Sequence, residues 1–148
     1  MNPNRITDIN WSDFETAYGS AKKIPAYLQD LFSGDMDLAI EATGWLWASL
    51  CHQHAYISSA ALPSYDFLLA KLNDANDLLK VEILDIILGF AVCTHAEYYK
   101  TNKLAPQEWE IELKRKLLGD FDKFKALSLS QNEDISYFAG EIVWCLSI

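Results

Sequence analysis

Two short segments combine cysteine with histidine, the residue types that bind zinc or act together as nucleophile and base. They are Cys51-His52-Gln53-His54 and Cys93-Thr94-His95. A structural zinc site usually pairs Cys-x2–4-Cys with His-x3–5-His, and neither segment has that spacing. Adjacent residues on a helix point about 100° apart, so Cys51 and His52 are poorly placed to react as a pair. We therefore expect no metal ligand, no cofactor and no catalytic residue here.

A structural interpretation of the same histidines fits better. His52 is expected at the end of a helix, where its ring can hydrogen-bond the unpaired carbonyls and suits the helix dipole. Gln53 and His54 would then brace the loop that follows. The three cysteines, the third being Cys145, are an odd number inside apolar stretches, so we expect reduced and buried thiols.

Carboxylates also occur in pairs that could do acid–base chemistry. Glu82 and Asp85 are three residues apart, and Glu108 and Glu112 are four apart, so each pair shares a helix face. Such charges are more often a solvated face. The chain has no Gly-x-Ser-x-Gly motif and no glycine-rich phosphate loop, so we expect no enzymatic activity.

The elements that position these residues are predicted to be helices. Capping residues, apolar positions at helical spacing and glycine stops predict helices over residues 12–19, 20–34, 35–51, 60–72, 77–100, 106–124 and 132–148. Their predicted N-caps include Asp35 or Asp37, Asn76 and Asn132. No segment alternates cleanly enough to predict a strand.

The helices repeat in pairs. Ile24-Pro25-Ala26-Tyr27 and Leu62-Pro63-Ser64-Tyr65 match at an offset of 38 residues, and each is followed by an acidic turn and a second helix. Each second helix also has an interior glycine, Gly44, Gly89 or Gly140, which suggests close backbone packing. This period is typical of HEAT-type repeats. We expect an all-α, α-α solenoid of about three pairs plus a short N-terminal helix, in one domain over 1–148.

A resemblance to a known group supports this prediction. Residues 46–63 read LWASLCHQHAYISSAALP. The pattern of tryptophan, Leu-Cys-His-Gln, tyrosine, small residues and an apolar-proline pair resembles small bacterial HEAT-like repeat proteins, and helical spacing extends the likeness loosely over residues 20–100. Members of that group resemble the immunity proteins encoded beside polymorphic toxins. The resemblance implies a protein that binds one cognate toxin domain and blocks it.

Charge points to the kind of partner. The chain has 21 acidic and 12 basic residues, a net charge of −9. This negative charge disfavours binding to nucleic acid and to anionic membranes, and it favours binding to a basic protein. We expect a basic, nuclease-like toxin domain as partner, and a monomer or weak dimer before binding. The absence of a signal peptide and of a membrane span in the sequence predicts the cytoplasm. An adaptor or scaffold that docks a cellular protein is the alternative, and a nucleic-acid enzyme is a third that the charge disfavours.

The predicted contact surface combines acids with aromatic residues on the second helices. Second helices usually line the concave side of a repeat stack, so their polar positions form an acidic trough. The predicted partner-binding residues are Asp37, Glu41, Trp47, Glu82, Asp85, Tyr137, Glu141 and Trp144. Trp45 is expected in the core, and the basic cluster at Lys114, Arg115 and Lys116 is expected on a solvated face.

Overall fold

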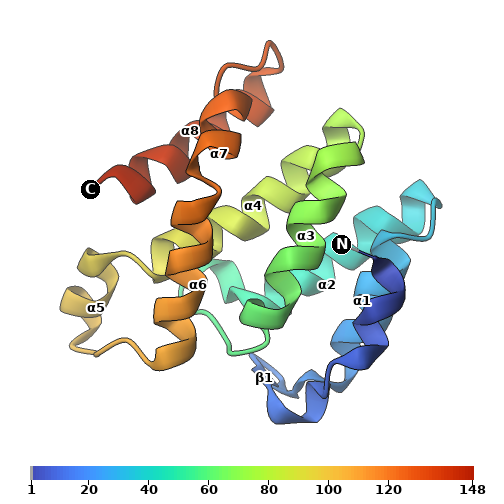
Figure 1. The fold of residues 1–148 in the computed structure, drawn as a ribbon, viewed down its shortest axis with the longest axis horizontal. Helices are drawn as coiled ribbons and strands as arrows, with labels where there is room; N and C mark the ends of the chain where they lie inside the picture. The colour runs from blue at the N-terminus through green and yellow to red at the C-terminus, as the bar shows by residue number, and fades with distance from the viewer. Residues whose placement is uncertain (1) are drawn as a thin grey trace.

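The computed structural model describes residues 2–148, and these are mostly α-helical (Figure 1). The helices of this part of the chain are α1 (Ile24–Leu31), α2 (Met36–Leu50), α3 (Ala61–Asp74), α4 (Asp77–Cys93), α5 (Ala96–Asn102), α6 (Glu108–Gly119), α7 (Phe121–Leu127) and α8 (Glu133–Ser147). Short 3-10 turns are η1 (Pro3–Asp8), η2 (Trp11–Asp13), η3 (Ala21–Lys23) and η4 (His52–His54), and a small hairpin joins β1 (Glu15–Thr16) to β2 (Gly19–Ser20). The all-α prediction is confirmed.

Three predicted N-caps are found at the starts of α2, α4 and α8. The Asp35 carboxylate accepts from the first-turn amides of α2, the Asn76 side chain accepts from Leu79 N at 3.0 Å in α4, and Asn132 caps α8 in the same way. Each cap supplies a partner to amides that have none inside the helix. The starts of α2, α4 and α8 are therefore fixed by local sequence.

The helices form two layers. The second-helix layer comprises α2, α4 and α8, with α4 in the middle packed against both neighbours. All three run in the same general direction in Figure 1, with their N-terminal ends toward the upper right. The first-helix layer comprises α1, α3, α6 and α7, of which α3 packs against α1 and α6, and α7 covers α8. One continuous hydrophobic cluster lies between the layers and extends from Ile6 to Leu146.

The segment predicted as a helix over residues 12–19 is a hairpin instead. Phe14 is extended, Gly19 has φ +105°, and Glu15 and Thr16 pair with Ser20 and Gly19. The reason lies in long-range contacts. The amide of Ala17 donates to the carbonyl of Ser49 at 2.9 Å, at the end of α2, so the backbone is paired outside its own segment.

Two predicted long helices are each divided in the structure. The helix over 77–100 ends at Cys93, because the Thr94 hydroxyl donates to Phe90 O at 2.7 Å and His95 Nδ1 then caps α5 by accepting from Glu97 N at 3.0 Å. The helix over 106–124 breaks at Asp120, between α6 and α7. The predicted start at Pro106 is two residues early, because α6 begins at Glu108 and Gln107 is its N-cap.

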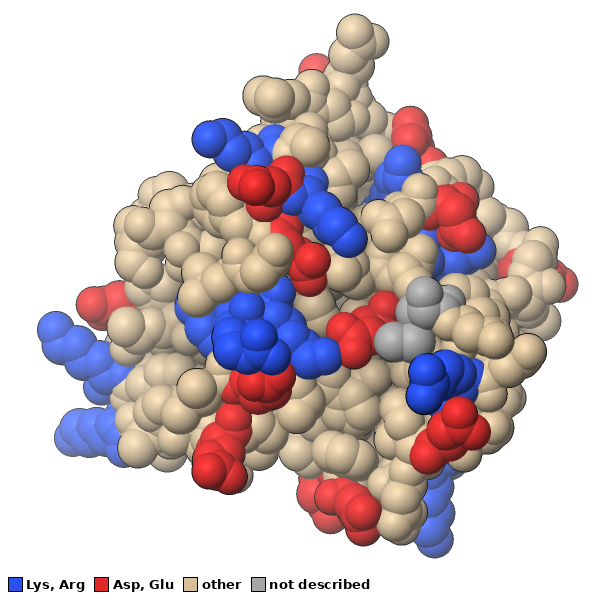
Figure 2. All heavy atoms as spheres, in the orientation of Figure 1, with Lys and Arg blue, Asp and Glu red and all other residues tan. Residues whose placement is uncertain are grey.

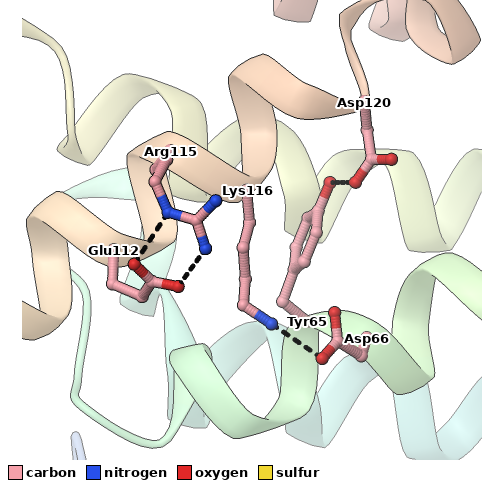
Figure 3. Close-up of polar contacts among 6 residues, drawn as sticks. All are labelled: Tyr65, Asp66, Glu112, Arg115, Lys116 and Asp120. Carbon is pink, nitrogen blue, oxygen red and sulfur yellow. Dashed lines mark hydrogen bonds and ion pairs between the residues drawn. The ribbon is translucent and has the colours of Figure 1, made fainter.

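Polar contacts join α3 to the break between α6 and α7 (Figure 3). The buried Tyr65 hydroxyl donates to Asp120 Oδ2 at 2.8 Å, and Lys116 Nζ donates to Asp66 Oδ2 at 2.8 Å. Arg115 Nε contacts Glu112 Oε2 of its own helix at 2.9 Å. Lys116 of α6 thus forms an ion pair with Asp66 of α3. The prediction that it lies on a solvated face is wrong for this residue.

Candidate interaction surface

Charge is distributed unequally between the two layers. Helices α2, α4 and α8 carry eight acidic residues and one lysine, a net charge of −7. Helices α1, α3, α6 and α7 carry seven acidic and six basic residues, a net charge of −1. The eight acids of the second-helix layer are all at least partly exposed: Asp37, Glu41, Asp77, Glu82, Asp85, Glu133, Asp134 and Glu141. Most of the chain's excess negative charge therefore belongs to one layer.

The other face has a mixed character. Figure 2 shows the side on which α3 and α6 lie in front, and there red and blue side chains alternate, with a basic group near the centre flanked by acids. The ion pairs of Lys116 with Asp66 and of Arg115 with Glu112 belong to this first-helix layer. Its charges neutralise one another locally.

The N-terminal ends of the second helices lie side by side. Asn76 Nδ2 contacts Met36 Sδ at 3.8 Å, which joins the starts of α4 and α2, and Asn132 Nδ2 contacts Asp77 Oδ2 at 3.5 Å, which joins α8 and α4. Asp37, one turn before Glu41 on α2, is close to this edge, and both of their side chains are exposed. First-turn acids such as Asp37 also favour the helix dipole.

On α4, Glu82 and Asp85 lie close together but are only half-exposed. Burial raises the pKa of Glu82, and the neighbouring charge of Asp85 raises it further. Asp85 also has a partner that sequence reasoning did not assign to it. His54 Nε2 lies 2.9 Å from Asp85 Oδ1 and 2.9 Å from the Asp85 carbonyl. The Asp85 side chain is thus partly exposed on α4 and also contacts His54 of the loop.

This loop runs over α4 and is tightly constrained. Gln53 and His54 both have left-handed backbones, with φ of 54° and 58°. A Cβ built at Gly89 would lie 2.7 Å from Cys51 Sγ and 2.8 Å from His54 Cδ2, so only glycine fits beneath the loop. The close packing predicted for the interior glycines is therefore found at Gly89, whereas a Cβ at Gly44 or Gly140 would meet nothing within 4 Å.

The structural roles predicted for the two loop histidines match the contacts observed. His52 Nδ1 lies 3.3 Å from the Ala48 carbonyl in the last turn of α2, and His54 braces the loop against Asp85. The hydrogen bond to Asp85 raises the pKa of His54, although burial opposes the rise. The His54–Asp85 contact is called the clasp below.

Helix α8 presents three of the predicted residues on one face. Tyr137, Glu141 and Trp144 are spaced by four and three residues, so their side chains point the same way. Tyr137 is 60% exposed and Trp144 is 61% exposed, while Glu141 is half-exposed. This face offers two uncovered aromatic rings beside a carboxylate.

The two tryptophans of α2 differ in exposure from what the sequence predicts: Trp47 is partly buried and Trp45 is exposed. Trp47, predicted to contact a partner, packs against the core beside His54, and its buried indole N–H has no hydrogen-bond partner within residues 2–148. Trp45, predicted for the core, is 49% exposed and stacks on Tyr27. The prediction for Trp45 was wrong because it lies on the edge of α2 that faces away from α4, next to α1.

The cysteines are all free and buried. Burial raises the pKa of the Cys51 thiol well above its ordinary value and raises the pKa of Cys93 to about 12. Both thiols are therefore protonated near neutral pH, and a thiol is a much weaker nucleophile and metal ligand than a thiolate. Within residues 2–148, no three side chains of His, Cys, Asp and Glu gather in a group suited to a metal ion.

Comparisons with known proteins do not assign this chain to a family. No family model matches this sequence, and searches of curated proteins and of solved structures gave no significant match. A separate structural finding is that none of the helices described is long and apolar enough to cross a lipid bilayer.

Proposed function

We propose that this chain is an inhibitory binding protein of the toxin-immunity type. Its paired helices would form a short HEAT-like α-α solenoid, and its second-helix layer would cover the basic substrate groove of a nuclease-like toxin domain. The protein would act by occlusion and would perform no chemistry of its own.

The observation that carries the proposal is the charge difference between the layers. The layer of α2, α4 and α8 has a net charge of −7, against −1 for α1, α3, α6 and α7, so most of the negative charge of these helices belongs to one layer. A nuclease groove must be basic because it binds the phosphate backbone. Opposite charge on the two surfaces speeds the encounter and aligns the partners.

Exposed aromatic residues supply the second requirement of such a surface. Charge alone gives rate and orientation, whereas affinity comes mainly from a few buried anchors, among which Trp and Tyr are enriched. Tyr137 and Trp144 on α8 are both more than half exposed and flank Glu141. We expect them to become buried against the toxin domain.

The test is growth rescue. Any basic toxin domain found to be encoded beside this gene is expressed with and without this chain, and colony counts are compared. We expect the wild-type chain to restore growth and the variant Glu41→Lys with Glu141→Lys to fail, because two carboxylates of the acidic layer are reversed. The matched control is Asp30→Lys with Glu108→Lys, which reverses the same number of acids on the first-helix layer and should still protect.

If the wild-type chain protects against none of these toxin domains, the inhibitor proposal is overturned. Equal protection by the Glu41/Glu141 variant would exclude the acidic layer as the contact surface. A cellular protein captured by the wild-type chain and lost in the Glu41/Glu141 variant, without growth rescue, would favour the adaptor alternative.

A further inference from the structure

A pocket of about 360 Å³ opens beside the hairpin, between the first turn of α1 and the outer edge of α2. Its lining residues are Thr16, Tyr18, Ser20, Lys22, Lys23, Ile24, Tyr27, Trp45 and Ser49. This volume lies within the range of small-molecule sites, at the small end. Sequence reasoning selected none of these residues as a site, because they come from five separate elements: β1, β2, η3, α1 and α2.

The walls of the pocket are aromatic. Tyr27 and Trp45 stack with their ring planes 8° apart and their centroids 6.1 Å apart. Tyr18, at the tip of the hairpin, is 65% exposed, and Thr16 Oγ1 holds the tip in place by accepting from Tyr18 N at 3.1 Å. Large flat rings left in water gain free energy when another flat ring covers them. These walls therefore favour a planar apolar group.

A serine side chain also lines the pocket. Ser49 is only 4% exposed, and it lines the pocket from the last turn of α2. Its backbone carbonyl accepts from Ala17 N, but no hydrogen bond within residues 2–148 involves its hydroxyl. A hydroxyl that lines an open pocket and has no partner among the described residues is free to hydrogen-bond a polar group of a ligand.

The rim of the pocket is basic in an acidic protein. Lys22 and Lys23 form a 3-10 turn with Ala21 directly before α1, and both side chains are exposed. Neither makes an ion pair among the described residues. Two adjacent unpaired ammonium groups beside an aromatic wall suit an anionic group attached to a ring.

We propose that this pocket binds a small aromatic anion. The ring of the ligand packs on Trp45 and Tyr18, its phosphate or carboxylate meets Lys22 and Lys23, and a polar atom of the ligand pairs with the Ser49 hydroxyl. The pocket borders the second-helix layer through Trp45 and Ser49 of α2, but its basic rim comes from Lys22 and Lys23 ahead of α1. The proposal does not depend on the inhibitor function, because it requires no protein partner.

The test is calorimetric titration of the purified chain with adenosine 5′-monophosphate and, in a second arm, with indole-3-acetate. We expect at least one probe to bind with a Kd of about 1 mM or lower. Lys22→Glu with Lys23→Glu should weaken binding about tenfold or more, Trp45→Ala about fivefold, and Ser49→Ala about threefold. The matched controls, Lys100→Glu with Lys103→Glu and Trp144→Ala, should bind like the wild-type chain.

The outcomes separate the sources of the ligand. Binding of the nucleotide alone points to phosphate esters, and binding of indole-3-acetate alone points to aromatic carboxylates. Absence of binding of both probes at about 10 mM would overturn the proposal. So would neutral adenosine binding as tightly as its monophosphate, or lysine variants that bind unchanged. Lys22 and Lys23 are exposed, so their variants should fold normally. These variants therefore test the proposal even if the Trp45 variant misfolds.

Discussion

Gly89 shows how one residue can fix a loop. Its missing side chain lets Cys51 and His54 lie directly on α4, and the loop above it then holds two residues in left-handed backbone conformations. Such conformations persist only where surrounding contacts determine them. The clasp and the close approach at Gly89 supply those contacts here.

Gly89→Ala is expected to lower the free energy of unfolding by about 1–3 kcal/mol, because the new methyl group displaces Cys51 and His54. Gly140→Ala in α8 is the matched control. Nothing lies within 4 Å of its added Cβ, so it should stabilise the chain by up to about 1 kcal/mol through helix propensity alone. Urea denaturation of both variants measures the two effects, and equal values would show that Gly89 is not tightly packed.

The clasp predicts a pH dependence of stability. Because the pKa of His54 is raised in the folded protein, chiefly by its hydrogen bond to Asp85, the clasp contributes fully below the ordinary histidine pKa of 6.5 and is lost as pH rises through the raised value. We expect the free energy of unfolding to fall as pH rises from 6.5 through the raised pKa of His54. Asp85→Asn should flatten this slope, and an unchanged slope in that variant would contradict the clasp.

At the scale of elements, the sequence predicts what is local. The caps at Asp35, Asn76 and Asn132 are readable because a cap acts on amides two or three residues away. The hairpin that replaces the first predicted helix is not readable, because its amides pair with Ser49 and Ser59 from distant segments. For the same reason the acidic helices could be predicted, but the clasp and the aromatic pocket could not.

The joint between α3 and the α6–α7 break is an element-scale feature with its own prediction. Burial and the hydrogen bond to Asp120 raise the pKa of the Tyr65 phenol, so the hydroxyl remains a donor. Tyr65→Phe should lower the free energy of unfolding by about 1–2 kcal/mol, since Asp120 loses its donor.

Tyr137→Phe is the control for this joint, because the Tyr137 side chain is exposed and should tolerate the change. Thermal denaturation followed by circular dichroism compares the two variants. Equal melting temperatures would show that the Tyr65–Asp120 hydrogen bond does not stabilise the joint.

At the scale of the whole molecule, the excess negative charge of one layer should weaken the fold at low ionic strength. Like charges on α2, α4 and α8 repel one another, and salt screens charges separated by more than about 10 Å at 0.1 M. We expect the melting temperature to rise between about 0.01 M and 0.5 M NaCl. The Glu41→Lys, Glu141→Lys variant should show a smaller rise, and a larger one would contradict this account.

Helix α4 is flanked by α2 and by α8, and its interior residues from Ile83 to Ala91 are mostly buried. Helix α2 or α8 can therefore open while α4 keeps its other neighbour, whereas we expect α4 to be released only when the whole chain unfolds. Amide protons in the middle of α4 should consequently exchange with deuterium more slowly than those of α1 or α8, and their exchange rates should report global stability. Faster exchange in α4 than in α8 would show that the centre of the molecule opens on its own.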